Sequence, residues 1–270
     1  MHSDIPIVLK SAKAAGIKRR IAHSHNARLD IPQYLWPLVV FKHHCYEKYA
    51  TDFFGCSKLA LKWLFPLKWE RGVVVYNGID LNKFKFDKDV RNKIRTENRI
   101  SNDTLVFVNV GRCEAQKNQN FILDIAKNIH RDSLFIIIGE GSLYEHLKQR
   151  KERELLNNVW LLGNRSDVTE WLCAADVFLF PSTYEGLGIV AIEAQSSGLP
   201  VLATDNIPAE ADLGIGSLRR LPLNDTKRWI DAIRQTSVSY DKRSCLSEKA
   251  LASKYDIKKV TKEVEAIYLL

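Results

Sequence analysis

The feature that most restricts the fold of this chain is an alternation of short apolar runs and helical segments, which becomes regular at Thr104. The first four runs each lead into a loop that contains glycine, and a segment with helical periodicity follows. Continuous apolar runs of this length are typical of strands buried on both faces of a parallel sheet. The sequence therefore predicts an α/β fold with helices on both faces of the sheet. The expected strands are 105–110, 134–138, 159–162, 177–180 and 201–203, and the expected helices include 118–129, 142–156 and 166–173.

The unit that begins with strand 177–180 carries two carboxylates in a pattern that favours ligand binding. After the strand, a turn with Gly186 and Gly188 leads into a helix. Glu185 lies in this turn and Glu193 lies on the helix, about 12 Å further along at 1.5 Å per residue. The N-terminus of the helix, between the two carboxylates, favours a phosphate group. The unit therefore suits a ligand that has polar groups at both ends.

Two cations follow the first strand of the regular region. Arg112 and Lys117 lie after strand 105–110, around the start of the next helix. Because the carboxyl ends of parallel strands meet at one edge of a sheet, we expect both side chains near the Glu185 turn. An arginine fork and a lysine charge at such an edge favour a phosphate site over a solvated pair of cations.

The glycines after strand 134–138 do not complete a dinucleotide motif. Gly139 and Gly141 form a Gly-x-Gly pair, but Tyr144 stands where the third glycine is required. This difference counts against an NAD or FAD enzyme. The sequence also contains no Walker-A, zincin or nucleophile-elbow pattern.

The N-terminal region contributes two histidines. A helical pattern over residues 7–15 precedes a strand from Ile21, and His23 and His25 lie at the end of that strand. Ligands of open α/β sheets collect at such strand ends. By residue type alone, surface or capping histidines are the more common interpretation. No strand precedes the first helix, so we expect the first α/β unit to start halfway through.

Residues 34–69 are rich in aromatic and basic residues. A helix at a membrane surface has this composition, with apolar rings on one side and lysines that extend to the headgroups. A helix that packs on the protein core with a solvated lysine face has it as well, and such faces are common. The sequence favours the packed helix and leaves contact with a membrane as the alternative.

The segments on either side of the regular region predict both strands and helices. Residues 73–76 predict a strand that is ended by the turn dipeptide Asn77-Gly78. Residues 80–103 are highly charged and predict an exposed connector with a short helix, at a candidate domain boundary. Another helix is expected around Trp229, and residues 243–270 predict two final helices.

Composition narrows the class of partner and the compartment. The 270 residues include 40 Lys and Arg against 32 Asp and Glu, and the net charge of +8 favours anionic partners such as nucleotides or lipid headgroups. Basic patches of an RNA-binding type are not concentrated anywhere, so no nucleic-acid partner is expected. The five cysteines are scattered singly, which predicts reduced thiols and no metal site. Without a secretory signal or a membrane-spanning run, the sequence predicts a cytoplasmic protein, at most peripheral at the inner face of the cell membrane.

Several motifs together resemble the retaining GT-B glycosyltransferases of family 4, also described as glycosyltransferase group 1. The segment EGLGIVAIE at 185–193 is similar to the Glu-x7-Glu signature of that family. The segment RIAHSHN at 20–26 is similar to the capsule and exopolysaccharide enzymes within it. The other matching segments are 76–80 with Phe84, 110–112, 117–118, 138–141, 181–182 and 198–201.

The resemblance implies a role for each matching residue. Arg112 and Lys117 would hold the diphosphate of a nucleotide sugar. The main-chain amides of Gly186, Leu187 and Gly188 would contact the sugar and the phosphate. Glu185 would contact the sugar hydroxyls, and His25 or His23 would face the donor sugar and the acceptor. Glu193 would accept hydrogen bonds from the ribose. The main chain near Gly139, Gly141, Asn164 and Arg165 would border the nucleotide.

The resemblance also implies the domain organisation. Residues 1–75 would be the last part of an N-terminal Rossmann-like domain on the acceptor side. The first strands of that domain, and most of the domain with them, would be missing. Residues 76–236 would be a complete C-terminal nucleotide-sugar-binding domain, and residues 237–270 would form helices that pack back on the N-terminal part. The unpaired strand edge that results favours poor stability or association, so the chain is expected to be a truncated product or to need a partner chain.

The leading hypothesis for function is a retaining hexosyltransferase that uses a UDP-linked sugar donor. Its acceptor would be a saccharide or a lipid-linked saccharide in surface polysaccharide synthesis, and no cofactor or metal is expected, since no Asp-x-Asp metal pair is present. The alternative from another class is a non-catalytic nucleotide-sugar-binding subunit that acts with another chain. A sugar-nucleotide epimerase of the same architecture fits the Glu-x7-Glu turn less well.

Overall fold

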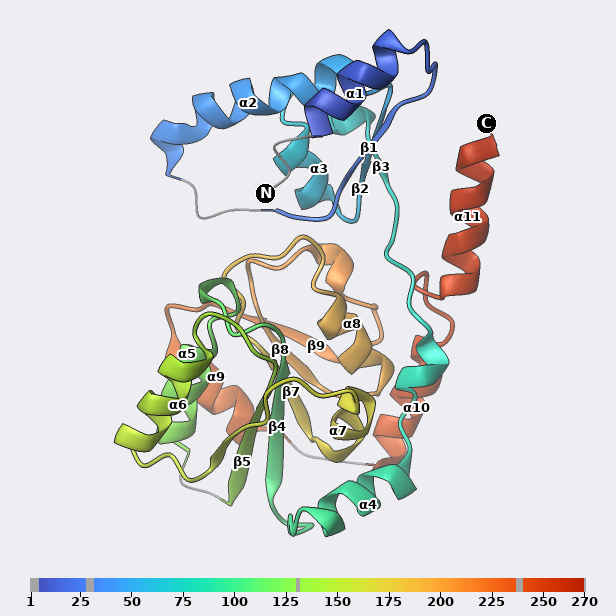
Figure 1. The fold of residues 1–270 in the computed structure, drawn as a ribbon. Coiled ribbons are helices and arrows are strands. Elements are labelled where there is room, and N and C mark those ends of the chain that lie inside the picture. The colour runs from blue at the N-terminus through green and yellow to red at the C-terminus, as the bar shows by residue number, and fades with distance from the viewer. Residues whose placement is uncertain (1–4, 28–31, 130–131, 237–239, 270) are drawn as a thin grey trace.

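The computed structural model describes residues 5–27, 32–129, 132–236 and 240–269 and contains two parallel sheets (Figure 1). The first sheet has the order β1-β2-β3 and the second has the order β6-β5-β4-β7-β8-β9. The predicted parallel α/β architecture is confirmed. The strands of the first sheet are β1 (Ile21–Ser24), β2 (Asp52–Gly55) and β3 (Val73–Val74). The strands of the second sheet are β4 (Leu105–Val110), β5 (Ser133–Ile138), β6 (Val159–Leu161), β7 (Val177–Phe180), β8 (Val201–Thr204) and β9 (Leu218–Leu221).

Strand β9 is the element of the second sheet that the sequence analysis missed. It pairs with β8 from Leu218 to Leu221 and has no strand on its other side among the described residues. Its two central residues are arginines, and Arg219 is exposed. An edge strand needs apolar residues only where it touches the core, so it lacks the continuous apolar run of the central strands.

Helices cover both faces of the second sheet (Figure 1). Successive strand residues point to opposite faces, so Phe107 packs on Phe135 on one face and Phe178 packs near Phe180 on the other. The first face is covered by α5 (Gln119–Lys127), α6 (Tyr144–Arg153) and α9 (Thr226–Arg234). The second face is covered by α4 (Lys88–Glu97), α7 (Val168–Ala174) and α8 (Ile189–Ser196).

Helix α4 confirms the short helix predicted within residues 80–103, but it is packed on the second sheet and not exposed. Its Arg91 and Arg95 are buried and both form ion pairs with Asp176, at 2.6 and 3.3 Å. Arg91 also donates to the main-chain oxygens of Ala174 and Ala175 at 2.6 and 2.8 Å. These partners compensate for the loss of hydration of the guanidinium groups, so a charged sequence here belongs to a packed helix.

The first sheet is covered by α1 (Ile5–Ala14), α2 (Trp36–Tyr49) and α3 (Lys58–Leu64). Tyr46 of α2 is buried with Phe53 and Phe65, so one face of this helix packs on the core as predicted. The opposite side of α2 exposes large apolar side chains, with Phe41 exposed to 80%. Among the described residues, no helix is both long enough and apolar enough to span a bilayer.

The last two helices connect the two sheets. Helix α10 (Tyr240–Ala250) packs against α8, and α11 (Ile257–Leu269) extends along the side of the molecule toward the first sheet (Figure 1). The junction between them forms a short parallel bridge in which Ile79 donates to the oxygen of Tyr255 at 2.8 Å. Arg19, next to the first sheet, donates to the oxygen of Ile267. The short 3-10 helices are η1 (Gln33–Leu35), η2 (Trp69–Arg71), η3 (Leu81–Phe84), η4 (Ala115–Lys117) and η5 (Ala209–Ala211).

Candidate functional site

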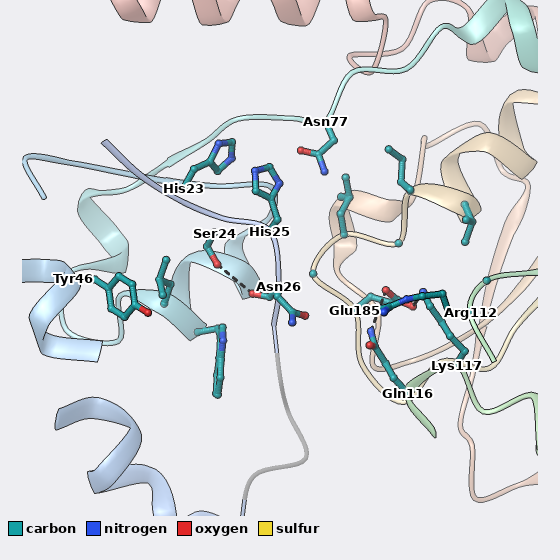
Figure 2. A pocket seen from close by; sticks show the side chains of 18 residues that line it. His23, Ser24, His25, Asn26, Tyr46, Asn77, Arg112, Gln116, Lys117 and Glu185 are labelled. Atoms are coloured by element: carbon teal, nitrogen blue, oxygen red, sulfur yellow. Dashed lines mark hydrogen bonds and ion pairs between the residues drawn. The ribbon is translucent and has the colours of Figure 1, made fainter. Parts of the chain in front are cut away.

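A hollow of about 560 Å³ lies between the two sheets, where the loops that follow β1, β4 and β7 meet (Figure 2). One wall comes from the first sheet and includes His23, His25 and Asn26. The other wall comes from the loops of the second sheet. It includes Gly111, Arg112, Gln116, Lys117 and the turn from Glu185 to Gly188. Most of the residues predicted to bind phosphate or to face the sugar therefore line one cleft.

An ion pair between Lys117 and Glu185 joins the loops after β4 and β7. The Lys117 Nζ atom donates to Glu185 Oε1 at 2.6 Å, and both side chains are largely shielded from water, with 17% and 7% of their surface exposed. Lys117 also lies 5.7 Å from the centre of the Phe180 ring. A pair with so little solvent is screened less than a surface pair, so it fixes the direction of the Glu185 carboxylate.

Hydrogen bonds from the turn η4 hold the same loop. Gln116 donates from its side chain to the oxygen of Tyr184 at 2.9 Å and accepts from the Thr183 amide at 2.8 Å. Asn118 adopts a left-handed conformation with φ of 54° and donates to the oxygen of Pro181 at 3.3 Å. Asparagine tolerates this conformation better than most residues. The loops after β4 and β7 are therefore one rigid unit.

Arg112 differs from Lys117 because its guanidinium group is exposed. Within the described part of the chain, this guanidinium group has no hydrogen-bond or ion-pair partner. Its main chain is held, since Gln119 donates to the Arg112 oxygen at 3.1 Å. Figure 2 shows the side chain extending toward Glu185 and Lys117. The site thus has one cation that is already paired and a second that is available for an anionic ligand.

Gly186 and Gly188 are required by the shape of the turn. A Cβ atom on Gly186 would lie 2.2 Å from the main-chain oxygen of His25, so the two walls of the cleft touch at this point. Gly188 precedes α8 with φ of 86°, in the left-handed region that favours glycine. Any side chain at Gly186 would force the walls apart.

The two histidines lie together on the opposite wall. The ring centres of His23 and His25 are 4.0 Å apart. Burial and the neighbouring His25 lower the pKa of His23 to about 4. Burial also lowers the pKa of His25, although a hydrogen bond with Asn77 acts in the opposite direction. Both rings are therefore neutral near pH 7. The buried Nε2 atom of His23 has no hydrogen-bond partner among the described residues.

Five residues with a predicted role do not line this hollow. Gly139 and Gly141 pack closely against the main chain of Gly111 and Cys113, which leaves no room for a Cβ atom. Arg165 is paired with Asp167 at 2.5 Å. The others are Asn164, which donates to Glu140 Oε2 at 3.1 Å, and Glu193 on α8. Their contacts with a nucleotide stay predictions.

Glu193 has an unusual environment for a helix glutamate. Burial raises its pKa to about 7, and the charge of Lys83 opposes this shift. A carboxyl group that is half-protonated near neutral pH is frequently found at a ligand site, although structural burial produces the same effect.

Several residues of the cleft were not identified from the sequence. Asn77 was interpreted as part of a turn and of a segment that resembles the family, without a role in the site, and Gln116 belonged to no motif. The apolar part of the first wall comes from Tyr46, Trp63 and Leu64. The aromatic composition of residues 34–69 was the available signal, but it did not show which rings face the cleft. Among the described residues, no group of three or more His, Cys, Asp or Glu side chains could hold a metal ion.

Comparisons with known proteins identify the family of the chain. Residues 90–215 match the family model of the group 1 glycosyl transferases. The chain is 30% identical over 270 residues to EpsF of Bacillus subtilis strain 168, which is named as a glycosyltransferase. That match covers 94% of this chain and 70% of EpsF. It is 34% identical over 184 residues to an Escherichia coli enzyme, UDP-Gal:alpha-D-GlcNAc-diphosphoundecaprenol alpha-1,3-galactosyltransferase. That match covers 64% of this chain and 46% of the enzyme.

Solved structures share the fold at lower identity. HepE of Anabaena in complex with UDP has a TM-score of 0.81 at 19% identity, and the match covers 100% of this chain and 77% of that chain. HepE with UDP and glucose has a TM-score of 0.84 at 19% identity, with coverage of 100% and 76%. At this identity the likeness establishes the GT-B type of fold.

Proposed function

Because this chain belongs to the group 1 glycosyl transferases, we propose that it binds a UDP-linked sugar in the cleft and transfers the sugar to a saccharide or lipid-linked acceptor. The observation that carries the proposal is the rigid unit formed by Lys117, Glu185 and the turn to Gly188, with the exposed Arg112 beside it. This unit places a carboxylate, two cations and main-chain amides at one point.

The cations would act on the diphosphate of the donor. When the bond between sugar and phosphate breaks, negative charge develops on the leaving phosphate, and fixed positive charge stabilises it most effectively in a site with little water. Arg112 would supply a two-point contact and Lys117 a point charge that it shares with Glu185. Lys117 needs no reorganisation for this role because Glu185 already holds it.

The carboxylate and the histidines would act on the sugar. Glu185 is an acceptor for sugar hydroxyls, and residues 186–188, which line the same hollow, carry main-chain amides that would donate to the ligand. A neutral His23 or His25 on the other wall can accept a hydrogen bond from a sugar hydroxyl without placing a positive charge there. We infer that the reaction retains the anomeric configuration and that Glu193 binds the ribose of the donor.

The acceptor side of the proposal rests on relatives. The Escherichia coli relative is named for an undecaprenol-linked acceptor and for UDP-galactose. Another relative, VipC/TviE of Salmonella typhi, is named for Vi polysaccharide biosynthesis. The chain spans 70% of EpsF and smaller shares of these relatives, so we propose surface polysaccharide synthesis as the process in which the full protein acts. Contact of the exposed apolar side of α2 with the inner face of the cell membrane would bring the site to such an acceptor.

Calorimetry and a transfer assay test the proposal directly. Purified protein is titrated with UDP, UDP-glucose and UDP-galactose, and then release of UDP from each sugar is measured with and without a polyprenyl-diphosphate-linked N-acetylglucosamine acceptor. We expect binding of UDP and acceptor-dependent release of UDP. Binding without release would identify a non-catalytic binding protein, and the absence of any UDP binding would contradict the proposal altogether.

A further inference from the structure

Ser57 links the first sheet to the Glu185 turn although it does not line the cleft. It is the N-cap of α3, and its Oγ atom accepts a hydrogen bond from the Ala60 amide at 3.0 Å. The same hydroxyl donates to the main-chain oxygen of Gly186, which is 129 residues away in the chain. A serine hydroxyl has one proton, so its donor is used by Gly186 while its acceptor serves the helix.

This hydrogen bond is made where the two walls of the cleft meet. Ser57 is fully buried, and Gly186 is in direct contact with the main chain of His25. On the other side of the turn, Glu185 is held by Lys117 at 2.6 Å. The turn is therefore fixed from the second sheet by an ion pair and from the first sheet by Ser57.

We propose that Ser57 is a positioning residue for the sugar of the donor. By holding the Gly186 carbonyl, it sets the orientation of the peptide planes of the turn, and therefore the direction of the amides and of the Glu185 carboxylate. The turn takes this orientation only while the first sheet lies against the second. This inference rests on the proposed function, because it assigns Ser57 to the sugar part of the same site.

A second contact of α3 provides a matched control. The Lys58 amide donates to Glu210 Oε1 at 2.9 Å, which joins the first turn of α3 to η5. This bond also crosses between the two halves of the molecule, but it does not involve residues 185–188. Loss of the Glu210 carboxylate therefore weakens the attachment of α3 and leaves the Ser57–Gly186 hydrogen bond in place.

The test compares Ser57→Gly with Ser57→Thr and Glu210→Ala. Glycine removes the donor but is well tolerated as a helix cap, whereas threonine retains the hydroxyl that makes both hydrogen bonds. We expect Ser57→Gly to weaken binding of UDP-glucose or UDP-galactose by roughly 3- to 10-fold, with UDP changed less than about 2-fold, as for one hydrogen bond. Ser57→Thr and Glu210→Ala should keep the wild-type ratio of UDP-sugar to UDP affinity. Equal losses for UDP and UDP-sugar in Ser57→Gly, no loss, or the same change of ratio in Glu210→Ala would overturn the proposal.

Hydrogen exchange separates this inference from the proposed function. In the protein without nucleotide, the amides of residues 185–188 should exchange faster in Ser57→Gly than in Ser57→Thr or Glu210→Ala. Unchanged exchange would overturn the positioning role even if the protein binds UDP. A wild-type protein that binds no UDP would contradict the proposed function, and faster exchange at the turn would still support the role of Ser57 in holding it.

Discussion

The two walls of the cleft are built on different physical principles. The wall from the second sheet is charged and internally bonded, with Lys117 fixed to Glu185 and the loops after β4 and β7 joined by Gln116. The wall from the first sheet carries two histidines that burial keeps neutral near pH 7, beside Tyr46 and Trp63. A charged wall suits a diphosphate, and a neutral aromatic wall suits a sugar ring. The contrast predicts that damage to the charged wall from the second sheet weakens the binding of anions most strongly.

The largest effect is expected from Lys117→Ala. It leaves the Glu185 carboxylate, with 7% of its side chain exposed, without its cation. Removal of one partner of a buried pair costs about 3 kcal/mol of unfolding free energy, and loss of the charge at the leaving phosphate should lower transfer by roughly 100-fold or more. Urea unfolding and UDP release measure the two effects.

The matched control is Lys127→Ala, which removes a lysine with 62% of its side chain exposed from an ion pair with Glu154. It should cost less than about 1 kcal/mol and leave UDP release unchanged. If both lysine variants behave alike, the charged wall has no special role.

Gly186→Ala tests the point at which the walls touch. The added Cβ atom would lie 2.2 Å from the His25 oxygen, so we expect a loss of about 1–3 kcal/mol in unfolding free energy and weaker binding of UDP-sugars. Gly214→Ala is the control, since its φ of 72° is strained for alanine but its Cβ atom would meet nothing within 4 Å. Equally weakened UDP-sugar binding in the Gly214 variant would contradict the role of the contact between the walls.

Arg112→Ala separates binding from stability. Because the Arg112 guanidinium is exposed and has no partner among the described residues, the change should alter unfolding free energy by less than about 0.5 kcal/mol. UDP affinity should fall by roughly 10- to 100-fold, as for hydrogen bonds to a charged group.

Arg165→Ala is compared with it in the same titration, since Arg165 is paired with Asp167 outside the hollow. The structure predicts little change in UDP affinity for this variant. A loss of UDP affinity as large as that of Arg112→Ala would show that Arg165 contacts the nucleotide.

A smaller effect is expected from pH at Glu193. Its pKa of about 7 lies above the usual 4.5, so between these values the folded protein keeps a proton that the unfolded chain has released. Stability should therefore decline as pH rises from 4.5 to 7, and Glu193→Gln should remove this part of the dependence. Thermal unfolding across this range measures it, and an identical slope in wild type and variant would contradict it.

His23 should give the stability of the protein a pH dependence opposite to that of Glu193. Its pKa of about 4 lies below the usual 6.5, so between these values the unfolded chain binds a proton that the folded protein does not. Stability from this residue is therefore lost as pH falls from 6.5 to 4, and His23→Gln should reduce that loss. The same unfolding curves provide the measurement, and a variant as acid-sensitive as the wild type would show that His23 is not buried neutral.

The sequence by itself determined the sheet, the position of strand 177–180 and the turn that carries Glu185, because buried parallel strands and glycine turns leave strong local patterns. It did not reveal β9 or the burial of Arg91, since an edge strand and a compensated charge both look like surface. It placed Arg112 and Lys117 near the Glu185 turn but did not reveal the contacts that form the walls of the cleft. That Gly186 touches His25, that Lys117 is paired with Glu185 and that Ser57 reaches across 129 residues depends on how two sheets pack together. Contacts between distant segments arise from three-dimensional packing and leave no periodicity in the chain, so only the tertiary structure decided them.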